Sequence, residues 1–343
     1  MKGLIRKRPV AIFVLLLLML FVTVMASALV GSPGVDISFP RVIGIIFSGL
    51  PGIGKMLPEY SGTDVIIIRQ IRLPRILLGV LGGIALSISG TSMQGIFKNP
   101  MASPFILGVS AGAAFGAAAS VVLGLGMYTL PAVAFVSAMG TALLVFGLGR
   151  IHGKTDVATL LLAGLAVNFL MQSLTAYLIY LSPPEKRTSI IFWMWGSFNG
   201  TVWQEFWIVL PVVIIGMIIV YVFSRELNVL QLGDESALYL GVEVEKTKIV
   251  LLGASSLLAA VVVSFTGIIG FVGLIIPHAT RIITGPDHKK LLPTAAIIGG
   301  IFMVLCDTIS RASGEIPIGI ITGLFGAPFF IYLLLRSRGE TGW

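Results

Sequence analysis

Charged residues are scarce in this chain of 343 residues: they make up 11% of the sequence, whereas 56% of the residues are hydrophobic. A soluble domain carries about 25% charged residues, so the shortage excludes a cytosolic enzyme, and the apolar content excludes a disordered chain. Cysteine is nearly absent, since Cys306 stands alone and cannot form an internal disulfide. The sequence therefore excludes a secreted disulfide scaffold and argues against a thiolate metal site.

Groups that carry out enzyme chemistry are also missing. The three histidines, His152, His278 and His288, show no spacing that would place two of them on one helix face as metal ligands. Residues 49–55 match the start of a phosphate-binding loop, but Met56 stands where magnesium coordination needs serine or threonine. We find no nucleophile elbow and no carboxylate pair for acid–base work. The sequence predicts neither an enzyme nor a resident metal.

Charge inside the apolar runs is almost absent as well. An ion-coupled secondary transporter usually keeps a titratable group in mid-helix, whereas Asp156, Glu205, Asp307 and Arg311 fall near the ends of the runs. Asp307 and Arg311 lie four residues apart, and a helical ion pair explains them. If the chain takes part in transport, we expect the energy to come from a partner.

Ten apolar runs, each close to the about 20 residues that span a bilayer, follow one another along the chain. The first, at about 9–30, contains a sequence at 26–28 that imitates a signal-peptidase site, but its length predicts a retained helix. The other nine lie at about 73–95, 105–125, 129–149, 157–181, 205–224, 247–266, 268–284, 292–310 and 317–335. We predict an all-α polytopic membrane protein with ten transmembrane helices.

Basic residues outnumber acidic ones, 23 against 15. They lie in short clusters between the apolar runs, a pattern that orients a protein in the membrane and does not indicate nucleic-acid binding. Most of them fall on the same side as the N-terminus. With an even number of helices, this bias predicts a multi-pass protein of the cell membrane whose N- and C-termini are both cytoplasmic.

The longest polar segment on the predicted cytoplasmic side covers about 225–246. We expect Asp234 to cap a short helix at 235–240, and Gly241 can end that helix in the left-handed conformation. Such a short, patterned segment suits the docking of a cytosolic partner. From composition alone, an ordered loop without a partner fits equally well.

On the opposite side, Arg69, Arg72 and Arg75 lie within seven residues of one another at the start of the second run. Snorkelling to the membrane interface explains a single arginine there. Three together form a basic patch suited to carboxylates of an external partner. Arg311 offers the same chemistry at the outer end of the ninth run.

A set of motifs gives the sequence a family resemblance. They are RLPR at 72–75, GTSMQG at 90–95, KNPMASP at 98–104, LGVSAGA at 107–113, WMWG at 193–196, LGDESALYLGV at 232–242, GFVGLIIPH at 270–278, GPDH at 285–288, EIPIG at 315–319 and GAPFF at 326–330. In this order they resemble the permease family of iron–siderophore, haem and vitamin B12 ABC importers, the FecCD type. The resemblance runs from about residue 65 to the C-terminus.

This resemblance implies one transmembrane permease domain over residues 1–343, with type II ABC importer architecture, that works as a homodimer. Two cytosolic ATPase subunits, which hold ATP and magnesium, would drive it, so the chain itself would bind no cofactor. An external binding protein would deliver the cargo. The residues implied in ATPase coupling are Leu227, Leu232, Gly233, Asp234, Glu235, Ala237, Leu240 and Gly241.

The resemblance also implies an outer contact and a translocation path. Binding-protein glutamates would meet Arg72, Arg75 and Arg311. The path would be lined by the runs at 157–181 and 317–335 and by a short external helix at about 189–198. The side chains and glycine implied in the path are Asn168, Gln172, Ser173, Thr175, Trp195 and Gly196. For the first four, hydrogen bonding between helices explains the residue at least as well.

The implied cargo is an iron chelate, such as a siderophore or haem, or cobalamin. A molybdate-type oxyanion is the alternative cargo, and an ion-coupled secondary transporter is the alternative mechanism. The few charges in the apolar runs suit a path that lets a large complex pass intact. With three histidines and one cysteine, the chain is not expected to strip bare metal from its carrier.

Overall fold

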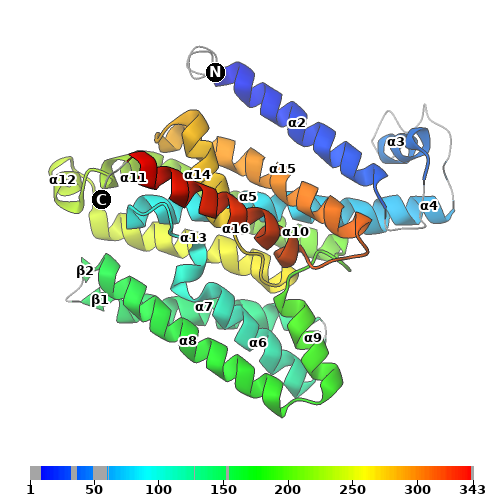
Figure 1. Ribbon diagram of the computed structural model, residues 1–343, viewed down its shortest axis with the longest axis horizontal. Helices are drawn as coiled ribbons and strands as arrows, with labels where there is room; N and C mark the ends of the chain where they lie inside the picture. The colour runs from blue at the N-terminus through cyan, green and yellow to red at the C-terminus, as the bar shows by residue number, and fades with distance from the viewer. Residues whose placement is uncertain are drawn as a thin grey trace.

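The computed structural model describes residues 9–31, 37–48, 60, 62–126, 128–151 and 154–340. The described chain is almost wholly helical (Figure 1). In order, the helices are α2 (Pro9–Leu29), α3 (Phe39–Phe47), α4 (Thr63–Ile66), the π-helical η2 (Ile67–Arg72), α5 (Leu73–Phe97), the 3₁₀ turn η3 (Pro104–Leu107), α6 (Val109–Leu123), α7 (Leu130–Leu148), α8 (Val157–Leu181), α9 (Pro184–Met194), α10 (Trp203–Val222), α11 (Ser224–Leu230), α12 (Asp234–Tyr239), α13 (Val244–Thr266), α14 (Val272–Thr284), α15 (His288–Ala312) and α16 (Ile318–Glu340). Two short strands, β1 (Arg150–Ile151) and β2 (Lys154–Thr155), pair antiparallel.

Seven helical segments are long and apolar enough to cross a membrane. One is the continuous segment formed by α4, η2 and α5, and the other six are α2, α7, α8, α10, α13 and α15. In three further helices, α6, α14 and α16, the apolar part is only 10–17 residues long. Helices α6 and α14 are therefore shorter than the apolar runs predicted at 105–125 and 268–284. The reason is local: η3 and the left-handed Gly108 precede α6, and the extended residues after Gly267 precede α14. A predicted apolar run includes such turns because their residues are apolar too.

Helix α5 forms the centre of the larger helix group and packs against α13, α14, α15 and α10. In the segment that contains it, 83% of the apolar window is buried. Glycines allow this contact. A Cβ atom placed on Gly90 would lie 1.8 Å from the carbonyl oxygen of Gly273, and one on Gly83 would lie 2.1 Å from that of Gly299. Small residues let the backbones touch, which is how membrane helices gain packing energy without a hydrophobic effect between them.

The helices form two neighbouring groups (Figure 1). Helices α6, α7, α8 and α9 form one group, which contacts the other mainly through α13. At one end of the molecule lie α12 and the strand pair, and α3 and α4 lie at the opposite end. Helix α2 begins, and α16 ends, toward the end that holds α12. The predicted cytoplasmic and external segments are therefore at opposite ends of the same bundle.

Candidate functional site

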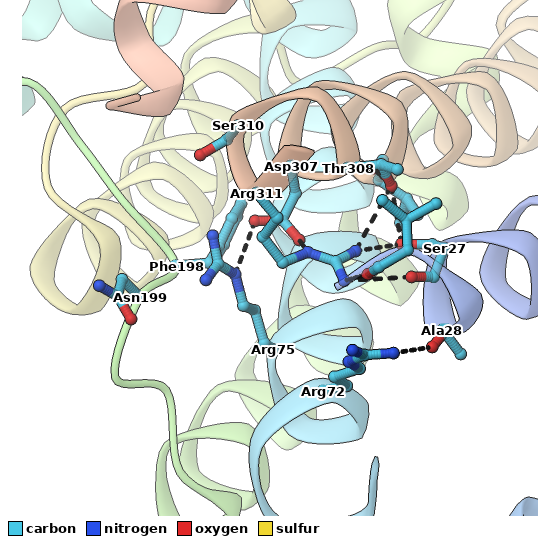
Figure 2. A network of polar contacts seen from close by, with 12 residues as sticks. Ser27, Ala28, Arg72, Arg75, Phe198, Asn199, Asp307, Thr308, Ser310 and Arg311 are labelled. Atoms are coloured by element: carbon cyan, nitrogen blue, oxygen red, sulfur yellow. Dashed lines mark hydrogen bonds and ion pairs between the residues drawn. The ribbon is translucent and has the colours of Figure 1, made fainter. Parts of the chain in front are cut away.

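The end of the bundle near α3 and α4 holds a buried charge network (Figure 2). Asp307 of α15 is fully buried and lies between two arginines. Its Oδ1 accepts a hydrogen bond from Nε of Arg75 at 2.8 Å, and its Oδ2 accepts one from Nε of Arg311 at 3.0 Å. The ion pair expected between Asp307 and Arg311 is therefore confirmed. Arg75, from α5, was not predicted to share the same carboxylate, because it lies 232 residues away in the sequence.

The network also holds the end of α2. The last carbonyl groups of a helix have no partner within the helix, and a nearby cation stabilises them. Arg72 donates from Nη1 to the Ala28 oxygen at 2.9 Å, and Arg311 donates from Nη1 to the Ser27 oxygen at 3.1 Å. Arg311 also reaches the Ser27 hydroxyl and the Val30 oxygen. Two of the predicted docking arginines thus cap a helix of their own chain (Figure 2).

This arrangement corrects the expectation of an open basic patch. Arg72, Arg75 and Arg311 are only 4%, 4% and 3% exposed, because the end of α2 and the side chain of Asp307 cover them. Their contact with an external partner stays a prediction. The most accessible part of the network is Glu315, whose side chain is 29% exposed and whose Oε2 lies 2.8 Å from Nη2 of Arg75. Glu315 has a left-handed backbone, with φ of 65°.

Arg69, the first arginine of the predicted patch, has a different set of partners. Its Nη2 donates to the Ile45 oxygen at 3.1 Å and to the Ser48 hydroxyl at 3.0 Å, so it fastens α3 to η2. The Trp203 ring nitrogen donates to the Arg69 backbone oxygen at 2.8 Å. Arg69 is half-buried, whereas Arg72 and Arg75 are buried. Each of the three arginines bonds to a different neighbouring element, which explains why they cluster there.

At the opposite end, the predicted coupling segment forms α11 and α12. Gly233, with φ of 111°, is the residue before α12, and Asp234 is its first residue. The expectation that Asp234 caps this helix is wrong, because its carboxylate is drawn to two lysines instead. Oδ1 accepts from Lys98 at 2.8 Å and Oδ2 accepts from Lys248 at 2.5 Å. Gly241 has φ of 79°, so the predicted left-handed end of this segment is confirmed.

The two lysines lower the pKa of the Asp234 carboxyl. Partial burial pushes that pKa upward, but the hydrogen bonds and charges of Lys248 and Lys98 outweigh it and bring the pKa below its ordinary 3.8. Asp234 is therefore ionised at neutral pH. Because both oxygens already have a lysine, the carboxylate serves as an internal link between elements.

The residues predicted for coupling divide into a buried and an exposed set. Leu227 and Ala237 are fully buried, Leu227 against Gly95 of α5, so they hold the segment in place. Glu235 is exposed. Exposed apolar side chains surround it, namely Leu232 at 66%, Leu238 at 61%, Tyr239 at 92% and Leu240 at 55%. Sequence reasoning missed Leu238 and Tyr239, although their place in a six-residue helix with a buried Ala237 would have put them on the outer face.

Helix α11 has a second anchor at the start of α15. Asn228 donates from Nδ2 to Oδ1 of Asp287 at 2.9 Å, and its own Oδ1 accepts from the His288 backbone nitrogen at 2.8 Å. The Nδ1 atom of His288 lies 2.8 Å from the same oxygen. The GPDH motif at 285–288 therefore holds α11, part of the predicted coupling segment, in place, and His288 takes part in this hydrogen bonding. In the described part of the chain, no three His, Cys, Asp or Glu residues gather to hold a metal ion.

The predicted path residues lie in different surroundings. Gln172 and Thr175 line a cavity of about 280 Å³, together with residues of α6 and α9 such as Ser110, Ala114 and Met194. Asn168 donates to the Gly164 oxygen at 2.8 Å and lies near the carbonyls of η3, so helix packing explains it, and Ser173 is exposed.

The short helix expected at 189–198 is α9, which begins and ends earlier, at Pro184 and Met194. Trp195 and Gly196 follow it, because Gly196 takes φ of 73° and turns the chain. Their carbonyl oxygens accept hydrogen bonds from the backbone nitrogens of Gly319 and Ile318, at 3.0 and 2.9 Å. The residues that follow α9 are thereby fastened to the start of α16, so the two predicted path elements are neighbours.

Known proteins match this chain in sequence and in fold. The model of the FecCD transport family matches residues 15–336. The chain belongs to the FecCD transport family. A cobalamin import system permease protein of Halobacterium salinarum is 47% identical over 80% of this chain and 75% of its own length. A hemin transport system permease protein of Yersinia pestis is 39% identical over 79% of this chain and 84% of its own length.

A solved structure shares the fold of this FecCD chain. It is a metal-chelate type ABC transporter in an inward-facing conformation, with a TM-score of 0.82 and 33% identity. The match covers 95% of this chain and 99% of the other. The chain is thus an ABC importer permease of the FecCD type and a multi-pass membrane protein, as its motifs indicated.

Proposed function

We propose that this chain is the membrane-spanning subunit of an importer that carries a metal complex of an organic ligand: cobalamin, haem or an iron siderophore. The observation that carries the proposal is the kind of cargo for which the relatives are named, a metal held by an organic ligand. One is named for cobalamin, another for hemin, and the solved structure for a metal chelate. The described residues hold no cluster of metal ligands that would favour bare metal as cargo.

The proposal includes ten crossings, with the three shorter helices α6, α14 and α16 added to the seven long segments. Both termini would then lie in the cytoplasm. The supporting geometry is that α2 begins and α16 ends at the end of the bundle that holds α12 (Figure 1). The excess of basic residues on this side agrees with the positive-inside rule.

The proposal also includes a homodimer. Helix α8 carries the predicted path residue Gln172 and exposes a row of large apolar side chains, including Leu162 at 67%, Phe169 at 62% and Tyr180 at 74%. A path that runs along the dimer axis would place this face of α8 toward the second copy, with Gln172, Ser173, Trp195 and Gly196 near the cargo. None of these named residues is charged, which suits weak contact with a large complex.

Energy would come from two cytosolic ATPase subunits that dock on the exposed face of α12. This face combines Glu235 with the apolar side chains of Leu232, Leu238, Tyr239 and Leu240. Tyrosine is one of the residue types that most often contribute a large share of the binding energy of an interface, so Tyr239 is the central residue of this face. ATP and magnesium would be held by those subunits.

An external binding protein would deliver the cargo at the end of the bundle near α3. Here Arg75 is shared by Asp307 and Glu315, and Glu315 is the more exposed of the two carboxylates. A glutamate of the binding protein could reach Arg75 by taking the place of Glu315. Replacing Arg75 would then weaken docking as well as the internal network.

The cargo assignment can be tested with the external binding protein of the same system. We expect its fluorescence to change with cobalamin, hemin or a ferric siderophore, and uptake into proteoliposomes to follow the same cargo. Molybdate and the metal-free ligands are the controls. Binding and uptake of molybdate alone would contradict the proposal.

A further inference from the structure

A charge cluster beside the docking face joins three separate elements. Asp234 at the start of α12 binds Lys98, which follows α5, and Lys248, which lies in α13. Each carboxylate oxygen serves a different lysine, at 2.8 and 2.5 Å. The side chains of Lys98 and Asp234 are partly exposed, at 36% and 40%, whereas that of Lys248 is 2% exposed.

The cluster contains a buried charge, the ammonium group of Lys248. A buried ammonium group is costly unless it is paired and hydrogen-bonded, and Asp234 is the carboxylate that pairs with it here. Its Nζ also lies 3.3 Å from the Thr155 oxygen, and the Thr155 nitrogen donates to Oε2 of Glu245 at 2.8 Å. The strand β2 is thus drawn into the same cluster. An α12 that moved away from α13 would take from Lys248 the carboxylate that is hydrogen-bonded to it.

Lys98 links the cluster to the most buried helix of the molecule. It is the residue after α5 and takes a left-handed backbone, with φ of 51°, which turns its side chain toward α12. Helix α5 runs 25 residues from Leu73, a length of about 37 Å at 1.5 Å per residue. Its other end carries Arg75, in the network with Asp307. One helix therefore connects the two predicted docking regions.

We propose that Lys98 and Lys248 are positioning residues for ATP-driven transport: by sharing the Asp234 carboxylate they fasten α12 to α5 and α13, so that displacement of α12 is passed along α5 to the outer charge network. This inference rests on the proposed function. In this proposal Asp234 holds α12 against the rest of the chain, and Glu235, Leu238 and Tyr239 contact the ATPase. A loss of the lysine contacts should uncouple hydrolysis from transport without preventing assembly.

The test uses the full complex of permease, ATPase subunits and binding protein in proteoliposomes. For Lys98→Met we expect basal ATP hydrolysis and ATPase association to match the wild type, while cargo imported per ATP falls about fivefold or more, as loss of a coupling contact does. Lys98→Arg keeps the charge and should restore the ratio. Lys246→Met is the control, since Lys246 lies in α13 two residues before Lys248 but forms an exposed pair with Glu243 at 3.5 Å.

A second comparison separates coupling from folding. Lys248→Met removes the buried charge and should also lower the import-to-hydrolysis ratio while the complex stays assembled. Combining Lys98→Met with Asp234→Asn should cost no more coupling than Asp234→Asn alone, because both changes act on one contact.

An unchanged ratio in Lys98→Met would overturn the inference, and so would loss of ATPase association in that variant. A wild-type complex that imports cargo without ATP would instead overturn the proposed function, and the inference with it.

Discussion

Asp307 shows how a single buried residue organises the outer end of the bundle. Its two oxygens bind one arginine from α5 and one from its own helix. The second arginine, Arg311, continues to the end of α2. One carboxylate thereby joins three helices whose residues are far apart in the sequence. Spacing along the chain predicted only the pair formed within α15, because the others depend on packing between helices.

Replacing Asp307 with asparagine should destabilise the protein by about 3–5 kcal/mol, because breaking a buried pair leaves uncompensated buried charge. Thermal unfolding in detergent measures the loss. Asp64→Asn is the control: Asp64 pairs with Arg41 at 2.6 Å, but both side chains are accessible, at 31% and 48%. A surface pair contributes at most about 1 kcal/mol. Equal losses in the two variants would contradict this account of Asp307.

Asp234 predicts a pH dependence at the inner end. Its pKa in the folded protein lies below its ordinary 3.8. A lowered carboxyl pKa stabilises the folded state above the ordinary pKa, and this contribution is lost as the pH falls through the lowered value. The stability difference between wild type and Asp234→Asn should therefore be constant from neutral pH to about pH 5 and vanish only in strong acid. Unfolding curves at several pH values test this, and a difference that disappears near pH 6 would be inconsistent with it.

At the scale of elements, close helix crossings are formed where glycine faces glycine. Gly90 of α5 meets Gly273 of α14, with no room for a side chain between them. Small residues at such a crossing let the two helix backbones touch. The partners at each crossing could not be predicted, because they depend on how helices distant in sequence are placed.

Gly90→Ala should lower the melting temperature and cost at least about 1–3 kcal/mol, since the added methyl group overlaps the Gly273 carbonyl. Gly140→Ala in α7 is the matched control, because nothing lies within 4 Å of its added Cβ atom. Its effect should be small. A Gly90→Ala protein as stable as the wild type would show that α5 and α14 are farther apart than in this structure.

The docking helix α12 carries its own prediction. Tyr239→Ala should weaken ATPase association by about 30-fold, the loss of 2 kcal/mol typical of a central aromatic residue. Its melting temperature should not change, because Tyr239 is 92% exposed. Tyr128→Ala, at a residue that is 100% exposed and lies outside this face, is the control. Affinity measured with the purified subunits decides, and equal affinity of the two variants would remove Tyr239 from the interface.

For the whole molecule, the sequence predicted the class and the family, because composition, apolar runs and ordered motifs are local properties. The number of long helices was predicted less well, since the turns before α6 and α14 are as apolar as the helices that follow. The outer arginines were predicted to form a basic patch for an external partner, and in the structure Arg72, Arg75 and Arg311 are buried. Whether a side chain is buried depends on elements that pack against it. The end of α2, which covers Arg72, lies 44 residues away in the sequence, so the residues next to Arg72 do not predict its burial.

Beyond its family, the account depends on one claim: the chain is a conduit whose driving force comes from ATPase subunits at α12. The most direct measurement is cargo uptake into proteoliposomes that contain the permease with and without those subunits, with ATP supplied or withheld and with an ionophore present. We predict uptake only with both the subunits and ATP, unaffected by the ionophore. Uptake by the permease alone, driven by an ion gradient and abolished by the ionophore, would contradict the account.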